Sequence, residues 1–255
     1  MVGVIERRLL INYRVDPDVA ARLLPDPFRP QLVRGKAVAG ICLLRLGALR
    51  PAGFPRLVGQ RSENAAHRVA VEWDGVGGVQ QGVFINRRDS NSLLNVAVGG
   101  RLFPGVHRRA SFEVTERADA IAIDVQSRDG DSSVGVRARV VSRLDGSDLF
   151  EDLEAASTFF RRGSVGFSPR GVAGHLDAME MTTDAWAIEP LRVEHVQSSF
   201  FEGLARFPAG SAVLDCGLIM RRVPVTWQGV EAERVPTPVS VAASELVAPS
   251  AWPGD

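Results

Sequence analysis

The segment SENAAHRVAVEW (residues 62–73), the turn-like DGVGG (74–78) and the segment VQQGVFI (79–85) decide the fold class of this chain. Both outer segments contain the β-branched and aromatic residues that are enriched in strands. The segment between them holds the Asp-Gly and Gly-Gly pairs that favour a tight turn. The sequence therefore predicts an antiparallel hairpin over residues 62–85.

The same pattern recurs along most of the chain. Further strands are predicted over residues 9–15, 37–46, 110–116, 120–127, 133–142, 179–188, 191–201 and 211–222. Helical periodicity is limited to residues 18–24, capped by Asp16 and Pro17, to 91–99, and to 148–160, opened by a capping box of Asp148 and Glu151. These elements predict a mainly β (α+β) fold, a closed or nearly closed antiparallel β-barrel with a few flanking helices. We expect one domain over residues 1–235 and an irregular C-terminal extension over 236–255.

The charge balance argues against polyanionic partners. The chain has 255 residues, 45% of them hydrophobic, and its 30 basic and 30 acidic residues give a formal net charge of zero. Such a chain has no long-range field to attract nucleic acid or an anionic membrane. No apolar run approaches the roughly 20 residues that span a bilayer. We therefore expect a soluble, cytoplasmic protein without nucleic-acid or membrane partners.

Lysine, cysteine and histidine usage limits the chemistry. Lys36 is the only lysine and lies at the tip of a predicted hairpin, so an amine for Schiff-base chemistry is scarce. The two cysteines, Cys42 and Cys216, lie in apolar stretches, where core thiols are the default interpretation. The four histidines are widely spaced without a metal-binding pattern, so neither a metal nor another cofactor is predicted.

Strand alternation sorts residues 62–73 between two faces. Glu63 and His67 share a face with the apolar residues of this strand, so both are expected to point inward, roughly 13 Å apart at about 3.3 Å per residue. A buried carboxylate or imidazole needs a partner or a function. The alternative to a functional role is that Glu63 pairs with an arginine and His67 with a backbone carbonyl. By the same alternation, His195 is expected to point inward on its own strand.

The order of several motifs resembles acetoacetate decarboxylase. YRVD (13–16), a short helix and LPDP (24–27) are similar to the start of that family, and the strand of Glu63 with its hairpin follows in the same order. FFRRGSVGFSP (159–169) and SSFF (198–201) resemble an uncharacterised bacterial branch of the superfamily, DUF2071. The resemblance covers residues 5–225. It implies the acetoacetate decarboxylase-like fold, and a homodimer is the expected assembly.

The resemblance also indicates where the reactive amine of acetoacetate decarboxylase would lie. In that family, a Gly-Arg-Glu segment leads to Pro-Lys-Lys, whose first lysine forms the Schiff base. Two alignments are open, which place the lysine pair on Arg108-Arg109 or on Gly105-Val106. Neither position holds a lysine, and a guanidinium stays protonated and is a poor nucleophile. Imine-based decarboxylation is therefore not expected.

These features favour an enzyme of lyase, isomerase or cyclase type that acts on a small keto or carboxylate compound by acid–base and electrostatic catalysis, without a Schiff base. The resemblance matches Glu63 to the family's catalytic carboxylate and hence to a base, with His67 or His107 as a second proton carrier. The substrate-binding candidates, expected at the same mouth, are Arg87, Arg101, Arg108 and Asp89. The competing hypothesis is a non-catalytic β-barrel that binds a small molecule, and a weaker one is a structural or oligomer-forming role.

Overall fold

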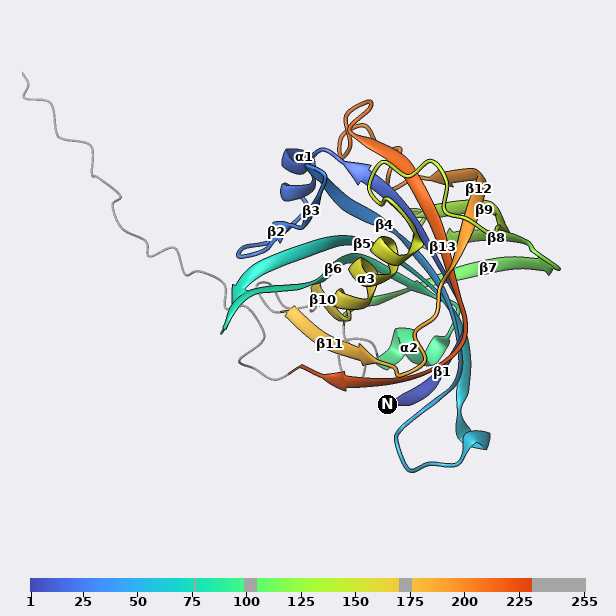
Figure 1. Cartoon of the computed structure of the whole chain (residues 1–255). Coiled ribbons are helices and arrows are strands. Elements are labelled where there is room, and N and C mark those ends of the chain that lie inside the picture. The colour runs from blue at the N-terminus through green and yellow to red at the C-terminus, as the bar shows by residue number, and fades with distance from the viewer. Residues whose placement is uncertain (76, 99–104, 170–175, 231–255) are drawn as a thin grey trace, which may run out of the picture.

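The computed structural model describes residues 1–75, 77–98, 105–169 and 176–230 (Figure 1). Within these residues the helices are short: α1 (Pro17–Ala21), α2 (Leu93–Val98), α3 (Leu153–Arg162) and the 3₁₀ helix η1 (Arg56–Val58). The strands are β1 (Val2–Val15), β2 (Arg29–Pro30), β3 (Leu32–Val33), β4 (Lys36–Arg50), β5 (Gln60–Gly75), β6 (Gly78–Ser90), β7 (His107–Arg117), β8 (Ala120–Ser127), β9 (Ser133–Val140), β10 (Val165–Pro169), β11 (Leu176–Thr182), β12 (Glu189–Ser198) and β13 (Ala212–Gly229). The mainly β fold class is confirmed. None of the described helices is both long and apolar enough to cross a membrane.

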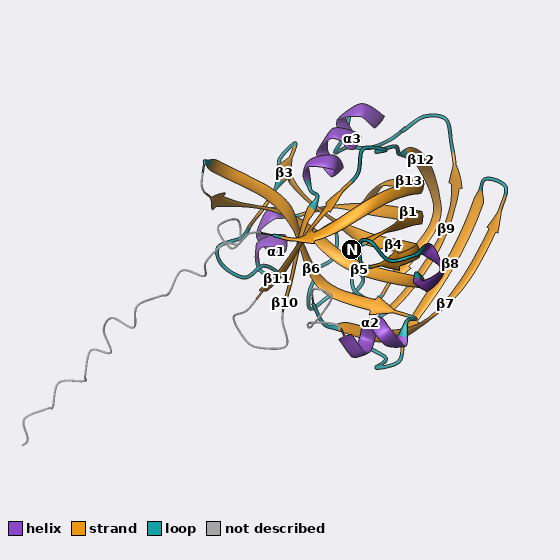
Figure 2. Ribbon diagram, turned by 90° about the horizontal axis from the view of Figure 1, so that it is seen from below, coloured by secondary structure: helices purple, strands orange, loops and turns teal. Residues whose placement is uncertain are grey.

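Five long strands in the order β13-β1-β4-β5-β6 form the shared centre of the sheet (Figure 1). From the two outer members of this group, β13 and β6, the sheet continues through β12, β9, β8 and β7 as one set and through β11 and β10 as another. The hydrogen bonding therefore closes two rings: a large ring through β7, β8, β9 and β12, and a small ring through β10 and β11. Figure 2 shows α3 and α2 on opposite sides of this arrangement.

The double closure corrects the prediction of a simple antiparallel barrel. Strand β13 is 18 residues long, so its middle pairs with β12 and its end with β11. Strand β6 likewise pairs with β10 at residues 83–84 and with β7 at 88–90, and both pairings are parallel. The sheet is therefore neither strictly a barrel nor wholly antiparallel.

The shared strands are buried on both faces. The large ring is filled by apolar side chains such as Leu9, Ile41 and Val69. On the opposite face of the same strands, Leu10 and Val38 belong to a second apolar cluster that α3 completes. This two-sided burial explains why residues 37–46 read as apolar on both faces, because neither face meets water.

Several predicted elements are confirmed in detail. The hairpin of β5 and β6 forms where predicted, and Asp16 caps α1 by accepting hydrogen bonds from the first-turn amides. Helix α3, however, begins at Leu153 with Asp152 as its cap, so the predicted capping box of Asp148 and Glu151 is wrong. The amide of Asp148 instead donates to the Asp215 carboxylate. Strand β10 was not predicted, and residues 236–255 lie outside the described part.

Candidate functional site

A cavity of about 160 Å³ lies inside the small ring. Its wall is largely apolar and draws on all seven strands of that ring. The polar side chains in the lining are Arg8, Cys42, Asn64, Arg68, Arg88, Asp89, Asn95, His107 and Ser164. A largely apolar concavity with a few polar groups is the usual form of a small-molecule site, so these side chains are the candidate functional residues.

Arg68 projects from β5 and is the most deeply buried cation of the cavity. It is 3% exposed, its Nη2 donates to Asn12 Oδ1 at 2.7 Å, and its guanidinium lies 5.0 Å from the centre of the Phe160 ring. Burial lowers the pKa of Arg68 to about 10, so the side chain remains charged near neutral pH. Its Nε has no hydrogen-bond partner within the described residues.

Two further arginines, Arg88 and Arg8, also line the cavity. Arg88 Nε donates to Ser168 Oγ at 2.9 Å, and burial lowers the pKa of Arg88 to about 10, an effect that the charge of Asp177 opposes. Arg8 donates from Nε to Cys42 Sγ at 3.3 Å. In the part of the chain that the structure describes, none of these three cavity arginines, Arg8, Arg68 and Arg88, forms an ion pair with a carboxylate. Among the described residues, the charge of these three guanidiniums is therefore not paired with a carboxylate.

His107 also lines the cavity, and the charge of Arg88 acts on it. Its Nδ1 lies 3.2 Å from the carbonyl oxygen of Gly105, and because a carbonyl only accepts, the proton of this contact is on Nδ1 and Nε2 is free to accept one. Burial, and then the charge of Arg88, lowers the pKa of His107 to about 4. Gly105 has a φ of 77°, and a Cβ there would come 2.6 Å from Ser168 Cβ, so only glycine lets this loop approach β10 so closely.

Glu63 lies in an ion-pair cluster rather than at the cavity. One carboxylate oxygen accepts from Arg7 at 2.6 Å and the other accepts from Arg45, and both arginines also pair with Glu116. The Glu63 side chain is 12% exposed. The arrangement matches the alternative in which Glu63 pairs with an arginine.

His67 is enclosed in the large ring. It is fully buried, its ring stacks on Phe200 at a centroid distance of 4.5 Å, and neither ring nitrogen has a partner among the described residues. The expectation of a backbone carbonyl partner is therefore wrong. Burial lowers the pKa of His67 to about 3. His195 is exposed, contrary to expectation, because a bulge between Val193 and His195 interrupts the alternation of β12.

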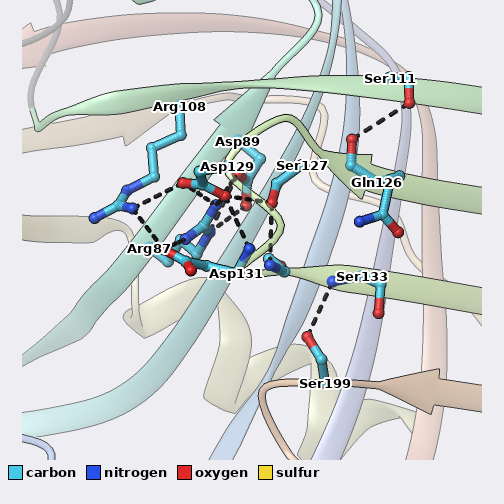
Figure 3. A network of polar contacts seen from close by, with 11 residues as sticks. Arg87, Asp89, Arg108, Ser111, Gln126, Ser127, Asp129, Asp131, Ser133 and Ser199 are labelled. Carbon is cyan, nitrogen blue, oxygen red and sulfur yellow. Dashed lines mark hydrogen bonds and ion pairs between the residues drawn. The ribbon is translucent and has the colours of Figure 1, made fainter.

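The other predicted residues form a separate network (Figure 3). Arg87 pairs with Asp89 and with Asp129, and Arg108 bridges Asp129 and Asp131. Figure 3 shows these side chains gathered at the turn between β8 and β9, which they hold against β6 and β7. Asp89 lines the cavity but uses both carboxylate oxygens on Arg87, and burial raises its pKa. Arg101 lies outside the described residues.

The composition of the cavity suits an anion rather than a metal ion. Its charged groups are mainly guanidiniums, which bind carboxylates and phosphates and cannot coordinate cations. Within the described ranges, no three His, Cys, Asp or Glu side chains gather closely enough to hold a metal. No role was predicted from the sequence for Arg8, Arg68 or Arg88. The sequence feature that could have indicated such a residue is an arginine within an otherwise apolar strand segment. Arg68 in AAHRVAV (65–71) fits this description best.

Comparisons with solved structures identify the fold. The chain resembles an acetoacetate decarboxylase-like enzyme from Sphingomonas wittichii RW1, with 14% identity, a TM-score of 0.53, and 89% of this chain and 90% of that one covered. It also resembles the enduracididine biosynthesis enzyme MppR with bound HEPES buffer, with 13% identity, a TM-score of 0.57, and 92% and 88% covered. The acetoacetate decarboxylase of Legionella pneumophila matches with 14% identity, a TM-score of 0.50, and 88% and 86% covered. At such identities the likeness establishes the acetoacetate decarboxylase-like fold alone.

Sequence comparison identifies the family. No protein of curated function matches the chain significantly. Residues 5–213 match the model of DUF2071, described as an uncharacterized conserved protein. This match spans most of the chain, which therefore belongs to the DUF2071 family and adopts the acetoacetate decarboxylase-like fold.

Proposed function

We propose that this protein is an enzyme of lyase, isomerase or cyclase type that binds a small keto or carboxylate compound in the cavity of the small ring. The observation that carries the proposal is that Arg8, Arg68 and Arg88 line one cavity without a carboxylate partner in the described residues. Taking a guanidinium out of water costs several kcal/mol unless a counter-charge compensates. A bound carboxylate would provide that compensation.

Within the described residues, the arginines that precede Arg8 and Arg88 in the sequence do have carboxylate partners. Arg7, the residue before Arg8, is 1% exposed and bonds to Glu63 and Glu116. Arg87, the residue before Arg88, pairs with Asp89 and Asp129. Among the described residues, Arg7 and Arg87 outside the cavity are thus paired with carboxylates, whereas Arg8, Arg68 and Arg88 inside it are not, which is the arrangement expected of an anion-binding site.

Size and similarity narrow the ligand class. A cavity of about 160 Å³ holds a small organic molecule rather than a nucleotide. Among proteins of the same fold, MppR is known in complex with pyruvate, a small 2-oxo acid. We therefore take small 2-oxo acids and related carboxylates as the substrate class.

The chemistry would proceed without an imine. Lys36, the only amine-bearing side chain, is exposed at the turn between β3 and β4 and is not part of the cavity wall. The cavity arginines would instead stabilise negative charge that develops on a carbonyl oxygen or an enolate. His107 would accept or return the proton at Nε2. A carboxylate bound to Arg88 would offset the charge that helps to keep the pKa of His107 low, so substrate binding would make His107 a better base.

Binding of pyruvate, measured by titration calorimetry, tests the proposal. Replacing Arg68 by glutamine removes one charge-assisted contact, which is worth about 1.5–3 kcal/mol, so affinity should fall roughly 10- to 150-fold. Arg137→Gln is the matched control, because Arg137 pairs with Asp124 on the exposed surface and should leave affinity unchanged. The proposal fails if the unaltered protein binds no small carboxylate, or if both variants bind equally well.

Two further measurements address the reaction. Borohydride added with pyruvate should leave Lys36 unmodified, and a reduced adduct on Lys36 would contradict the imine-free mechanism. Once a reacting carboxylate is found, His107→Gln should remove turnover while retaining most of the affinity. Binding without any turnover across a panel of 2-oxo acids would favour the alternative of a non-catalytic binding protein.

A further inference from the structure

Cys42 is a cavity group that the proposed mechanism does not yet use. It lies on β4 between Leu10 of β1 and Ala66 of β5, and it is 6% exposed. Its sulfur accepts a hydrogen bond from Arg8 Nε at 3.3 Å. Arg68 and Arg88 line the same cavity as Cys42. The thiol therefore lies among all three cavity arginines.

A second, independent observation indicates that a ligand belongs beside this thiol. Arg68 is 97% withdrawn from solvent, lines the same cavity, and leaves its Nε without a partner in the described part of the chain. A buried guanidinium donor without an acceptor is costly, so an acceptor carried by a ligand is expected there. Cys42 and Arg68 therefore line one cavity, in which a ligand acceptor could satisfy this donor.

The second cysteine provides an internal contrast. Cys216 on β13 is also 6% exposed, but it is not among the residues that line the cavity. Burial, and then the charge of Asp215, raises the pKa of Cys216 to about 12. A guanidinium favours the thiolate, which is the nucleophilic form, whereas burial beside a carboxylate favours the unreactive thiol. The Cys42 sulfur accepts from the guanidinium of Arg8, whereas the Cys216 sulfur accepts from the neutral side-chain amide of Asn12 at 3.6 Å, so two thiols of equal exposure have different donors.

We propose that Cys42 is a nucleophile whose sulfur adds reversibly to the carbonyl carbon of a small 2-oxo acid, while the cavity arginines hold the carboxylate of that acid. The inference rests on the proposed function and supplies the covalent step that the absent lysine leaves open. The sulfur forms a bond to the carbonyl carbon, the π electrons of the carbonyl move to its oxygen, and the proton that leaves the sulfur ends on that oxygen. The product is a hemithioketal, and no further reagent is required.

Alkylation of the unaltered protein tests the reactivity of Cys42 without a folding risk. Iodoacetate carries a carboxylate and iodoacetamide does not; each forms a C–S bond with release of iodide. Peptide mapping by mass spectrometry should show iodoacetate modifying Cys42 at least about tenfold faster than Cys216. The ratio of the iodoacetate rate to the iodoacetamide rate should also be higher at Cys42 than for free glutathione. In Arg8→Gln the ratio at Cys42 should fall to the value for glutathione. Equal rates at the two cysteines, or a glutathione-like reagent ratio at Cys42, would overturn the proposal.

Carbon-13 NMR of pyruvate labelled at C2 tests the adduct. With the unaltered protein, a protein-bound signal should appear in the tetrahedral carbon region, and it should vanish in Cys42→Ser but persist in Cys216→Ser. Calorimetry on Cys42→Ser distinguishes the anion-binding site from the nucleophilic role of Cys42. If this variant keeps its affinity for pyruvate but loses the tetrahedral signal, both hypotheses are supported. Pyruvate binding without any tetrahedral signal in the unaltered protein overturns the nucleophile and leaves the anion site standing. Preferential iodoacetate labelling of Cys42 in a protein that binds no 2-oxo acid would refute the proposed substrate class while supporting the reactive thiol.

Discussion

Two deeply buried arginines, Arg7 and Arg68, should differ in how strongly stability falls when each is replaced by methionine, which has a similar length and no charge. Arg7 is 1% exposed and forms ion pairs, whereas Arg68 is 3% exposed and forms none among the described residues. Burial lowers the pKa of Arg68 from 12.5 to about 10. Each pKa unit corresponds to about 1.4 kcal/mol, so keeping this guanidinium charged costs the fold about 3 kcal/mol at neutral pH.

Arg68→Met removes that cost but also removes two favourable contacts. Asn12 Oδ1 loses its donor, at a cost of about 2 kcal/mol for a buried unsatisfied acceptor, and the cation–π contact with Phe160 is worth about 1 kcal/mol. These losses offset the gain, so the free energy of unfolding should change by less than about 1 kcal/mol. Arg7→Met leaves Glu63 and Glu116 without one of their partners and should lower the free energy of unfolding by about 3 kcal/mol.

Urea denaturation followed by tryptophan fluorescence measures both values, provided that the dependence on urea concentration is the same in each variant. Saturating pyruvate adds a second readout. At about 100 times its dissociation constant, the ligand should stabilise the unaltered protein by about 2.7 kcal/mol and should have a much smaller effect on Arg68→Met at the same concentration. If Arg68→Met is destabilised as strongly as Arg7→Met, Arg68 is a structural cation, and the reasoning that assigns it to a ligand is refuted.

Three further perturbations test other parts of the structure. The pKa of His67 is about 3 in the folded protein against an ordinary value of 6.5, so the contribution of His67 to stability is complete above pH 6.5 and is lost as the pH falls toward 3. Replacing His67 by phenylalanine should therefore reduce the pH dependence of the unfolding free energy by up to about 1.4 kcal/mol per pH unit between pH 6.5 and 3. An unchanged pH dependence would be inconsistent with this assignment. The pKa of His107, followed by NMR, should rise when pyruvate binds because the charge of Arg88 is then offset, whereas a fall or no change would place the ligand elsewhere. Asp129→Ala removes the acceptor that Ser127, Arg87 and Arg108 share at the turn between β8 and β9. Urea denaturation should show a loss of about 1–2 kcal/mol in the unfolding free energy. A loss below about 0.5 kcal/mol would show that this network contributes little to stability.

Local patterns in the sequence were sufficient for the elements that depend on neighbouring residues. The Asp-Gly and Gly-Gly pairs of residues 74–78 specify the turn between β5 and β6 whatever surrounds it. Asp16 and Pro17 likewise place the start of α1, because the cap and the first helical position are local requirements. Strand β4 forms over the predicted residues 37–46, and its composition is apolar on both faces, as a central strand requires.

Features that depend on distant partners were not predictable from such patterns. Strand β10 has only five residues and pairs with β6 through Gly166 and Phe167, so its place in the sheet is set by a segment about 80 residues earlier in the chain. The dual pairing of β6 and β13 has the same origin, since strand length indicates that a second partner is possible but does not identify it. The bulge that exposes His195 has no clear local signal in β12.

The candidate site shows a different limit of strand alternation. Alternation separates Glu63 and His67 from Asn64 and Arg68, and the structure places them on opposite faces of β5 in agreement. The more apolar face was expected to hold the functional cavity. In this fold both faces of the shared strands are covered, so composition alone does not identify the face with unfilled space. The cavity lies on the side of Arg68.

This alternation also suggests how the cavity arginines are kept in place without a carboxylate partner among the described residues. Arg8, Arg68 and Arg88 each follow a residue on the same strand whose side chain is held firmly on the opposite face. Glu63 fixes the first of these preceding residues, Arg7, Phe200 stacks on His67, and Asp89 and Asp129 bind Arg87. Because successive side chains of a strand share one stiff backbone, anchoring one restricts the position of the next. The ion pairs and stacking contacts of the large ring would thereby orient the guanidiniums of the small ring, which is the preorganisation that electrostatic catalysis requires.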